Sequence, residues 1–133
     1  MCIRDSYRDW QVPLGRRFRS LKLWFVLRSY GAEGLRSHIR HHVEAAESFA
    51  DRVSDHPKLV LAAPVSLSLV CFSHIDGDDA TKALQEALNS TGEMMLTHTV
   101  LDDKHVLRLS VGGTWTTSTH VERVSELIDE ILG

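Results

Sequence analysis

One stretch near the start of the chain constrains its fold, because a sharply bent loop runs straight into an apolar helix. Pro13 fixes its own φ angle and disfavours helical backbone at Val12, and Gly15 admits conformations closed to other residues. No helix breaker then follows until Gly31. Apolar side chains at residues 23–27 surround more than one helical face, so we expect the second half of this helix to be covered on most sides.

Basic side chains crowd the same helix. They are Arg16, Arg17, Arg19, Lys22 and Arg28. Beside Trp24 and Phe25, such cations could serve as an RNA-binding surface. The formal net charge of -3 argues against a nucleic-acid or membrane-surface partner. We therefore expect these cations to pair with carboxylates of a neighbouring domain, and RNA binding is the alternative.

Length and composition fit a single globular unit. A chain of 133 residues with 43% hydrophobic content can bury a modest core. It has no apolar run long enough to span a bilayer and no signal-peptide layout, so we expect no membrane partner. Two cysteines, Cys2 and Cys71, suggest no disulfide framework, which favours a reducing cytoplasm. Residues 1–6 lack periodicity, and we interpret them as a non-native or disordered leader.

The middle of the chain predicts a second helix, two strands and a third helix. Residues 33–54 carry one apolar stripe at helical spacing. Two short apolar runs, residues 58–63 and 67–75, predict antiparallel strands, and Asp78 or Asp79 predicts the cap of the next helix. The stripe of the second helix is formed by Leu35, Ile39, Val43, Ala46, Phe49 or Ala50, and Val53.

The remainder of the chain predicts two more strands and a last helix. The strands fall at residues 94–101 and 105–112, and Thr119 with Glu122 predicts a capping box. The whole order predicts an α+β fold: two N-terminal helices, then a small, mainly antiparallel four-stranded sheet with helices packed on one face. The last helix is expected to bury Val121, Val124, Leu127, Ile128, Ile131 and Leu132.

Three histidines on the second predicted helix lie near one another. The spacing of His38, His41 and His42 brings imidazoles together on a helix. A metal site would need a further ligand and groups that orient the imidazoles. Because nothing else in the sequence converges on them, we expect no metal ion and interpret them as a polar surface opposite the apolar stripe. Cys71, within a strand pattern, is expected to be a buried thiol.

A series of short segments runs along the chain. Residues 10–24 read WQVPLGRRFRSLKLW, and residues 30–35 read YGAEGL. The series continues with LVCF at 69–72, VLR at 106–108 and HV at 120–121. Together these segments resemble the pyridoxal-phosphate-dependent decarboxylases of the aromatic-amino-acid type, also called group II. A resemblance that spans nearly the whole chain is more specific than a short motif.

The resemblance implies a domain organisation. Residues 32–133 would be the C-terminal small α+β domain of a fold-type I enzyme that uses pyridoxal 5'-phosphate (PLP). Residues 7–31 would be the loop and bridging helix from a large domain that this chain lacks. The complete enzyme would be a cytoplasmic, homodimeric carboxy-lyase with an amino-acid substrate. Because the family's proteins are several times longer, the chain would be a fragment of one.

The resemblance also assigns site residues. Leu14 and Gly15 match the loop that borders the substrate's side chain, although Gly15 is also explained by the turn alone. Arg8 matches an arginine behind the mobile catalytic loop, where it would anchor that loop or a carboxylate. A salt bridge that closes two domains is the alternative for Arg8. Ser6 stands where the family leads us to expect an acidic residue.

The sequence lacks the family's Schiff-base lysine. That lysine follows a histidine upstream of the WQVPLG run, and this chain has no His-Lys pair. We therefore assign no catalytic or cofactor-binding residue here and expect the chain to be inactive alone. The expected function is that of a C-terminal fragment of a PLP-dependent decarboxylase of aromatic L-amino acids. The alternative is a non-catalytic interaction or regulatory module of the same fold.

Overall fold

The computed structural model describes residues 18–133, so the expectations for residues 1–17 lie outside the described part. The chain divides into two compact units, residues 1–36 and residues 37–133. The described part of the first unit is helical from Ser20 onward. The second unit holds the sheet and the remaining helices.

Helix α1 spans Ser20–Asp55 and contains the expected break at Gly31. Gly31 has φ 68° and ψ 169°, a conformation that side-chain-bearing residues rarely adopt. Helical backbone continues on both sides of this one residue, so the two predicted helices form a single kinked element. Although α1 has 36 residues, neither it nor any other helix within residues 18–133 is apolar enough to cross a membrane.

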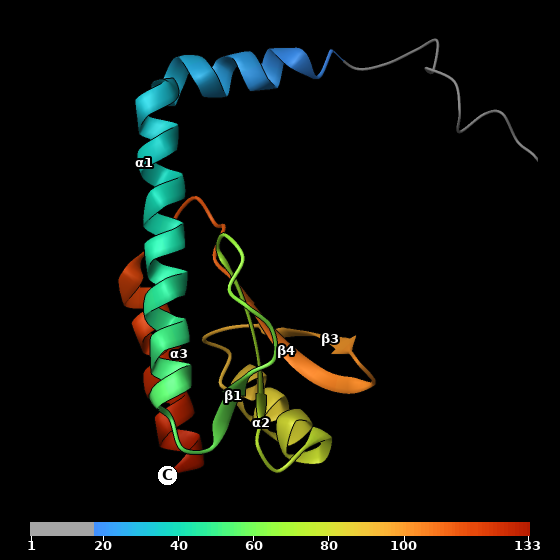
Figure 1. The fold of residues 1–133 in the computed structure, drawn as a ribbon. Helices are drawn as coiled ribbons and strands as arrows, with labels where there is room; N and C mark the ends of the chain where they lie inside the picture. Colours follow the sequence, from blue (N-terminus) through green and yellow to red (C-terminus); the bar gives the residue numbers. More distant parts are fainter. Residues whose placement is uncertain (1–17) are drawn as a thin grey trace, which may run out of the picture. The chain divides into compact units, whose positions relative to one another are not determined.

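The described part of the second unit has four strands and two further helices (Figure 1). The strands form one antiparallel sheet in the order β1-β2-β4-β3, which confirms the predicted four-stranded antiparallel sheet. A tight turn at Asp102 and Asp103, both with positive φ, joins β3 to β4. The elements are β1 (Leu59–Leu61), β2 (Leu69–His74), α2 (Asp78–Ser90), β3 (Thr97–Leu101), β4 (Lys104–Ser110) and α3 (Ser118–Leu132).

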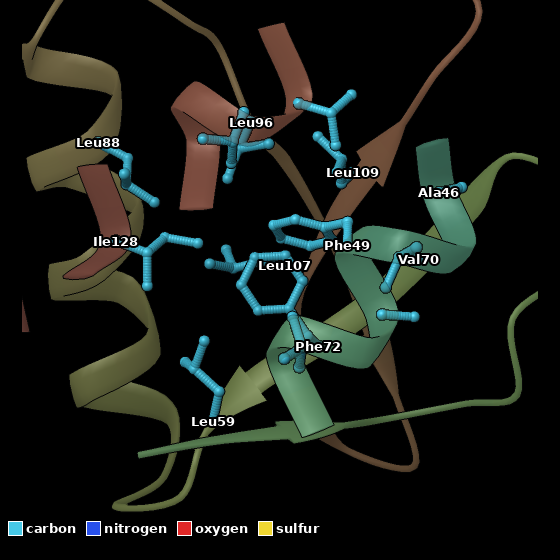
Figure 2. Close-up of a cluster of buried hydrophobic side chains, with 14 of the residues drawn as sticks. Ala46, Phe49, Leu59, Val70, Phe72, Leu88, Leu96, Leu107, Leu109 and Ile128 are labelled. Carbon is cyan, nitrogen blue, oxygen red and sulfur yellow. The ribbon is translucent and has the colours of Figure 1, made fainter. Parts of the chain in front are cut away.

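The core of the second unit lies on one face of the sheet (Figure 2). Phe72 of β2 and Leu107 of β4 are fully buried there. Phe49 of α1 packs edge-on against Phe72, with 5.4 Å between the ring centroids. Leu88 of α2 and Ile128 of α3 join the same cluster. All three helices therefore contribute to a single core against one face of the sheet.

Two helix starts differ from the sequence prediction. Gly77, with φ 97°, is the N-cap of α2, and Asp78 lies in the first turn without capping it. Oδ1 of Asp78 instead accepts a hydrogen bond from the backbone N–H of His105 at 3.0 Å, which ties α2 to β4. The N-cap of α3 is Thr117, whose backbone N–H donates to Nδ1 of His120 at 3.1 Å.

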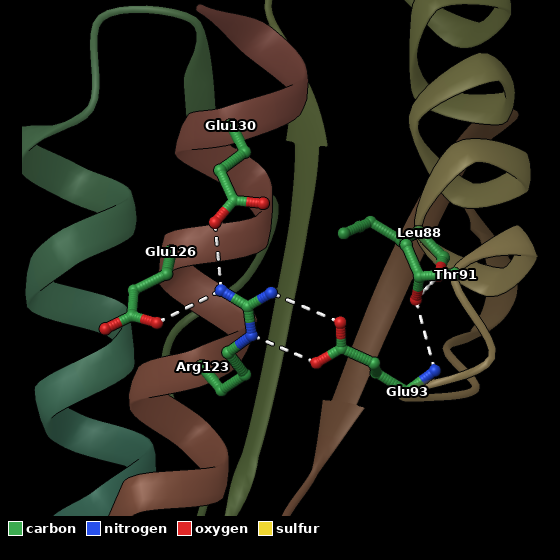
Figure 3. A network of polar contacts seen from close by, with 6 residues as sticks. All are labelled: Leu88, Thr91, Glu93, Arg123, Glu126 and Glu130. Carbon is green, nitrogen blue, oxygen red and sulfur yellow. Dashed lines mark hydrogen bonds and ion pairs between the residues drawn. The ribbon is translucent and has the colours of Figure 1, made fainter.

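Arg123 joins α3 to the segment before β3 (Figure 3). Its Nε and Nη2 donate to the carboxylate of Glu93 at 3.0 and 3.2 Å. Its Nη1 donates to Glu126 at 3.2 Å and to Glu130 at 2.9 Å. These hydrogen bonds to carboxylates raise the pKa of Arg123, and the bond from Arg123 lowers the pKa of Glu93. The network sits at the surface, so it orients α3 more than it stabilises the fold.

Candidate functional site

The residues that the sequence assigns to the substrate pocket lie outside the described part of the chain. Leu14, Gly15 and Arg8 all fall within residues 1–17. Their assignments stay predictions. The described residues offer four other features that bear on function: an apolar helix surface, two histidine clusters and the positions of the lysines.

The first half of α1 exposes a large group of apolar side chains, which we call the apolar helix surface. Trp24 is 53% exposed and Phe25 is 58% exposed. The expectation that this part of the helix is covered on most sides is therefore wrong for this chain. Large groups of exposed apolar side chains are typical of protein or membrane interfaces and of ligand-binding grooves. The surface consists of Phe18, Leu21, Leu23, Trp24, Phe25, Val26, Leu27 and Tyr30.

Aromatic and basic groups contact each other within the apolar helix surface. The rings of Trp24 and Phe25 meet edge to face, with 5.1 Å between their centroids. The guanidinium carbon of Arg28 lies 5.9 Å from the centroid of the Trp24 ring, a cation–π distance. Arg28 therefore contacts the aromatic surface itself, while its expected pairing with a carboxylate of another domain stays a prediction.

His42 faces the core, although the sequence predicts it on the polar surface; the predicted stripe is buried as expected from Ala46 to Val53. It is 6% exposed, and its Nε2 has no hydrogen-bond partner. Ile39, expected inside, is 58% exposed. Burial, and then the neighbouring His38 and His41, lower the pKa of His42. The His38 and His42 ring centroids are 4.2 Å apart, yet within residues 18–133 no three metal-binding side chains are arranged to hold an ion.

A second histidine cluster was not singled out from the sequence. Gln85 of α2 bridges the rings of His98 on β3 and His105 on β4, through its Nε2 at 3.2 Å and its Oε1 at 3.0 Å. The two rings stack with 4.3 Å between centroids. Burial and the nearby charges of His98 and Lys82 lower the pKa of His105, and Asp78 opposes this. Only the strand register, which places His98 diagonally across from His105, could have revealed this cluster.

The buried imidazoles of His42 and His105 predict that the stability of the fold depends on pH. A histidine whose pKa is lowered by folding binds fewer protons in the folded state, so the free energy of unfolding falls as the pH drops below about 6.5. We expect His42→Leu to flatten this loss and to raise stability at neutral pH, because it also removes an unpaired buried nitrogen. Urea denaturation at pH 7.5, 6.5 and 5.5 measures both effects; an unchanged pH slope contradicts the assignment.

The four lysines do not form a cofactor site in the described part of the chain. Lys22 is exposed on α1, and Lys104 is exposed beside the turn between β3 and β4. Nζ of Lys82 lies 3.7 Å from Asp79, and Nζ of Lys58 donates to the backbone carbonyl of Leu132. Four pockets among residues 18–133 were compared, and none of these four has a lysine in its wall. The described residues therefore do not fit an aldehyde cofactor that is held by a lysine.

Cys71 does not form a nucleophilic site either. It is a free, half-buried thiol on β2, less enclosed than the sequence predicts. Its partner across the strands is Arg108 of β4, and no histidine stands opposite it in the sheet register. Residues 18–133 therefore offer an exposed apolar surface on the first half of α1 and two histidine clusters.

Comparison with protein families matches the first half of the chain. The pyridoxal-dependent decarboxylase conserved domain matches residues 2–75. Among curated proteins, phenylacetaldehyde synthase of Arabidopsis thaliana is 44% identical over 132 residues, which cover 94% of this chain and 27% of that protein. Tyrosine decarboxylase 2 of the same plant is also 44% identical and has 24% of its length covered. The chain thus spans about a quarter of the curated relatives that it matches.

Comparison with solved structures agrees with the comparison with curated proteins. The crystal structure of Oryza sativa TDC with PLP and tryptamine matches with a TM-score of 0.85 and 39% identity. The match covers 92% of this chain and 28% of the rice chain. The order of helices and strands described above therefore recurs in one part of a much longer protein.

Proposed function

This chain belongs to the pyridoxal-dependent decarboxylase family, and we propose that it is a C-terminal segment of a decarboxylase acting on aromatic L-amino acids. The observation that carries the proposal is the apolar helix surface on residues 18–30, which belongs against another protein surface. The share of the relatives' length that the chain covers supports the same reading, because most of such a protein would be available to cover that surface.

The segment would contribute to the walls of the enzyme's substrate pocket and to the contact between its domains. Leu14 and Gly15 would wall the substrate's side chain, and Arg8 would anchor the catalytic loop. The first half of α1 would bridge to the large domain of a cytoplasmic homodimer. PLP supplies the electron sink for loss of carbon dioxide when bound, and residues outside this chain would hold it. The isolated chain would accordingly have no decarboxylase activity.

A second reaction is a candidate because one relative is named phenylacetaldehyde synthase. The same segment would then belong to an enzyme that releases an aldehyde rather than an amine. A non-catalytic interaction module is the further alternative. These three possibilities differ in the product that an assay detects, so one experiment separates them.

The test exchanges this chain for the matching segment of the rice protein. We expect the chimera to be soluble and to release carbon dioxide and an amine from an aromatic L-amino acid such as L-tryptophan. The chain alone, with PLP added, is expected to release neither. Product analysis by mass spectrometry detects the amine and, for the synthase alternative, the aldehyde.

The outcomes separate the hypotheses. A chimera that folds with the rice protein's circular dichroism and thermal midpoint but forms no product contradicts the proposed function and favours the non-catalytic module. Aldehyde as the main product would show that this segment itself shifts the reaction towards that of a synthase. Activity of the chain alone contradicts the proposal that its catalytic groups lie elsewhere. The unmodified rice protein is the control for folding and cofactor loading.

A further inference from the structure

Strand β3 lies at one edge of the sheet, because the strand order places it next to β4 alone. Its residues are exposed or half-buried along the whole strand. An edge strand with so little burial opens locally at low cost unless other groups hold it. Two amide side chains of α2 do so here. Gln85 reaches His98 of β3, and Asn89 pairs with the backbone of Leu96 just before β3.

The carbonyl of Leu96 fixes the orientation of the Gln85 amide. Nε2 of Gln85 donates to this carbonyl oxygen at 3.0 Å. A carbonyl oxygen only accepts hydrogen bonds, so the opposite orientation of the amide would bring two acceptor oxygens together. The NH2 group of Gln85 therefore faces Leu96 and His98, and its Oε1 faces His105.

The oriented amide determines which nitrogens of the two rings carry protons. The Gln85 NH2 group donates to Nδ1 of His98 at 3.2 Å, so the proton of this neutral ring is on Nε2. Oε1 of Gln85 accepts at 3.0 Å from Nε2 of His105, so that nitrogen carries the proton of the second ring. Of the nitrogens in these two rings, Nδ1 of His105 is left to take up a further proton without loss of a hydrogen bond to Gln85.

The surroundings of His105 disfavour a proton there. The ring is 9% exposed and stacks on His98 with 4.3 Å between the ring centroids. Burial, then the charge of His98 and then that of Lys82 lower the pKa of His105, while Asp78 opposes them. The Asp78 carboxylate is already engaged, because its Oδ1 accepts the backbone N–H of His105 at 3.0 Å.

Other charged groups near this end of the sheet belong to β2, α2 and the turn between β3 and β4. On β2, Nδ1 of His74 accepts the backbone N–H of Asp76 at 3.1 Å. On α2, Nζ of Lys82 lies 3.7 Å from Oδ1 of Asp79. In the turn, residues 102–104 are exposed. A proton on the pair of stacked rings is thus opposed by Lys82 and by the second imidazole, and favoured by Asp78.

We propose that Gln85, His98 and His105 form a pH-sensitive switch, which holds β3 to α2 while both rings are neutral and releases residues 97–101 when the pair takes up a proton. A proton on Nδ1 of His98 would meet the Gln85 NH2 group, so that hydrogen bond must break. A proton on Nδ1 of His105 would place a charge within the stack. Neither cost arises once β3 is released, so a lower pH favours release.

This switch differs from the pH dependence of global unfolding described above, because β3 opens while the core stays folded. Release should begin after Leu96, whose backbone N–H and carbonyl both remain paired with Asn89. The switch is a property of the second unit and does not depend on the proposed function.

The first test is NMR of the full chain carrying Trp24→Glu and Leu27→Glu, which remove two side chains of the apolar helix surface. At pH 7.5, ring-nitrogen shifts should show both His98 and His105 with the proton on Nε2. Between pH 7.5 and 5.5, hydrogen exchange corrected for its intrinsic pH dependence should show residues 97–101 opening at least about fivefold more than Phe72 does. A proton on Nδ1 in either neutral ring, or opening of β3 in step with Phe72, overturns the proposal.

The second test uses variants that keep the hydrogen bonds but take up no proton. His98→Asn keeps an acceptor near the position of Nδ1, and His105→Gln keeps a donor near that of Nε2. With both substitutions, β3 should open as in the parent chain at pH 7.5 and lose its pH dependence. Gln85→Leu removes the switch from the half-buried surface of α2, so β3 should open at least about fivefold more at pH 7.5 and respond little to acid.

His120→Asn is the matched control. His120 is an exposed histidine whose Nδ1 also accepts a hydrogen bond, from the backbone N–H of Thr117 at the start of α3. This substitution should leave the pH dependence of β3 unchanged. A pH dependence that survives in the double histidine variant contradicts the switch, and so does its loss in the control. If the double variant does not fold, unchanged opening in Gln85→Leu contradicts the switch by itself.

Discussion

Replacing Phe72 with alanine is expected to lower the free energy of unfolding by about 3–5 kcal/mol. Phe72 is fully buried and packs against Phe49 at the centre of the core, where helix α1 meets β2. The substitution removes the ring's burial and leaves a cavity that the surrounding helices cannot fill. Domains of this size are stable by roughly 5–15 kcal/mol, so the variant should be partly unfolded at moderate temperature.

Urea denaturation followed by far-ultraviolet circular dichroism measures this loss. Ile39→Ala is the control, because Ile39 is an apolar residue of α1 at 58% exposure and lies outside the apolar helix surface. We expect the control to change the free energy of unfolding by less than about 0.5 kcal/mol. Equal effects of the two substitutions would show that the second unit is not organised around the Phe49–Phe72 contact.

The apolar helix surface is expected to make the chain self-associate in the absence of another segment that covers it. We expect the wild-type chain to form oligomers, and the double substitution Trp24→Glu with Leu27→Glu to yield monomers of 15.0 kDa. The two residues lie three apart on the helix and so share one face. Size-exclusion chromatography with light scattering measures the mass of each variant.

The same double substitution carries a second expectation in the segment-exchange chimera. There the surface should be buried, and burying two carboxylates without partners is strongly unfavourable. We expect little soluble chimera, even though the substitution improves the isolated chain. Lys22→Glu is the control, because it changes the net charge by the same amount without altering the apolar side chains. A monomeric wild-type chain, or a chimera that tolerates the double substitution, contradicts the role given to this surface.

Helix and strand types followed from local sequence patterns. Alternation around Leu107 and Leu109 predicted β4, and both side chains are buried as expected. The stripe of α3 was also largely right, since Val124 and Ile128 are buried, although Ile131 at the end of the helix is 37% exposed. Such patterns are readable because burial on one face repeats with the period of the element itself.

The stripe of α1 was right at Ala46, Phe49, Ala50 and Val53, which are all buried, but the residue that begins it was not readable from the sequence. The sequence offers Ile39 as an inward residue, yet His42 takes the buried position. A stripe that mixes small, apolar and imidazole side chains is compatible with more than one rotation of the helix. Which one is adopted depends on what the sheet and the other helices present to it.

The sequence by itself determined the α+β order, the antiparallel strands and, through the segments between residues 10 and 121, the family. Those properties depend on residues near one another in the chain or on short segments that match the family's sequences. Only the tertiary structure decided that Gln85 joins His98 to His105 and that His42 of α1 is buried against the rest of the second unit. The physical reason is that these contacts join different elements, so they depend on strand register and helix packing that no local pattern specifies.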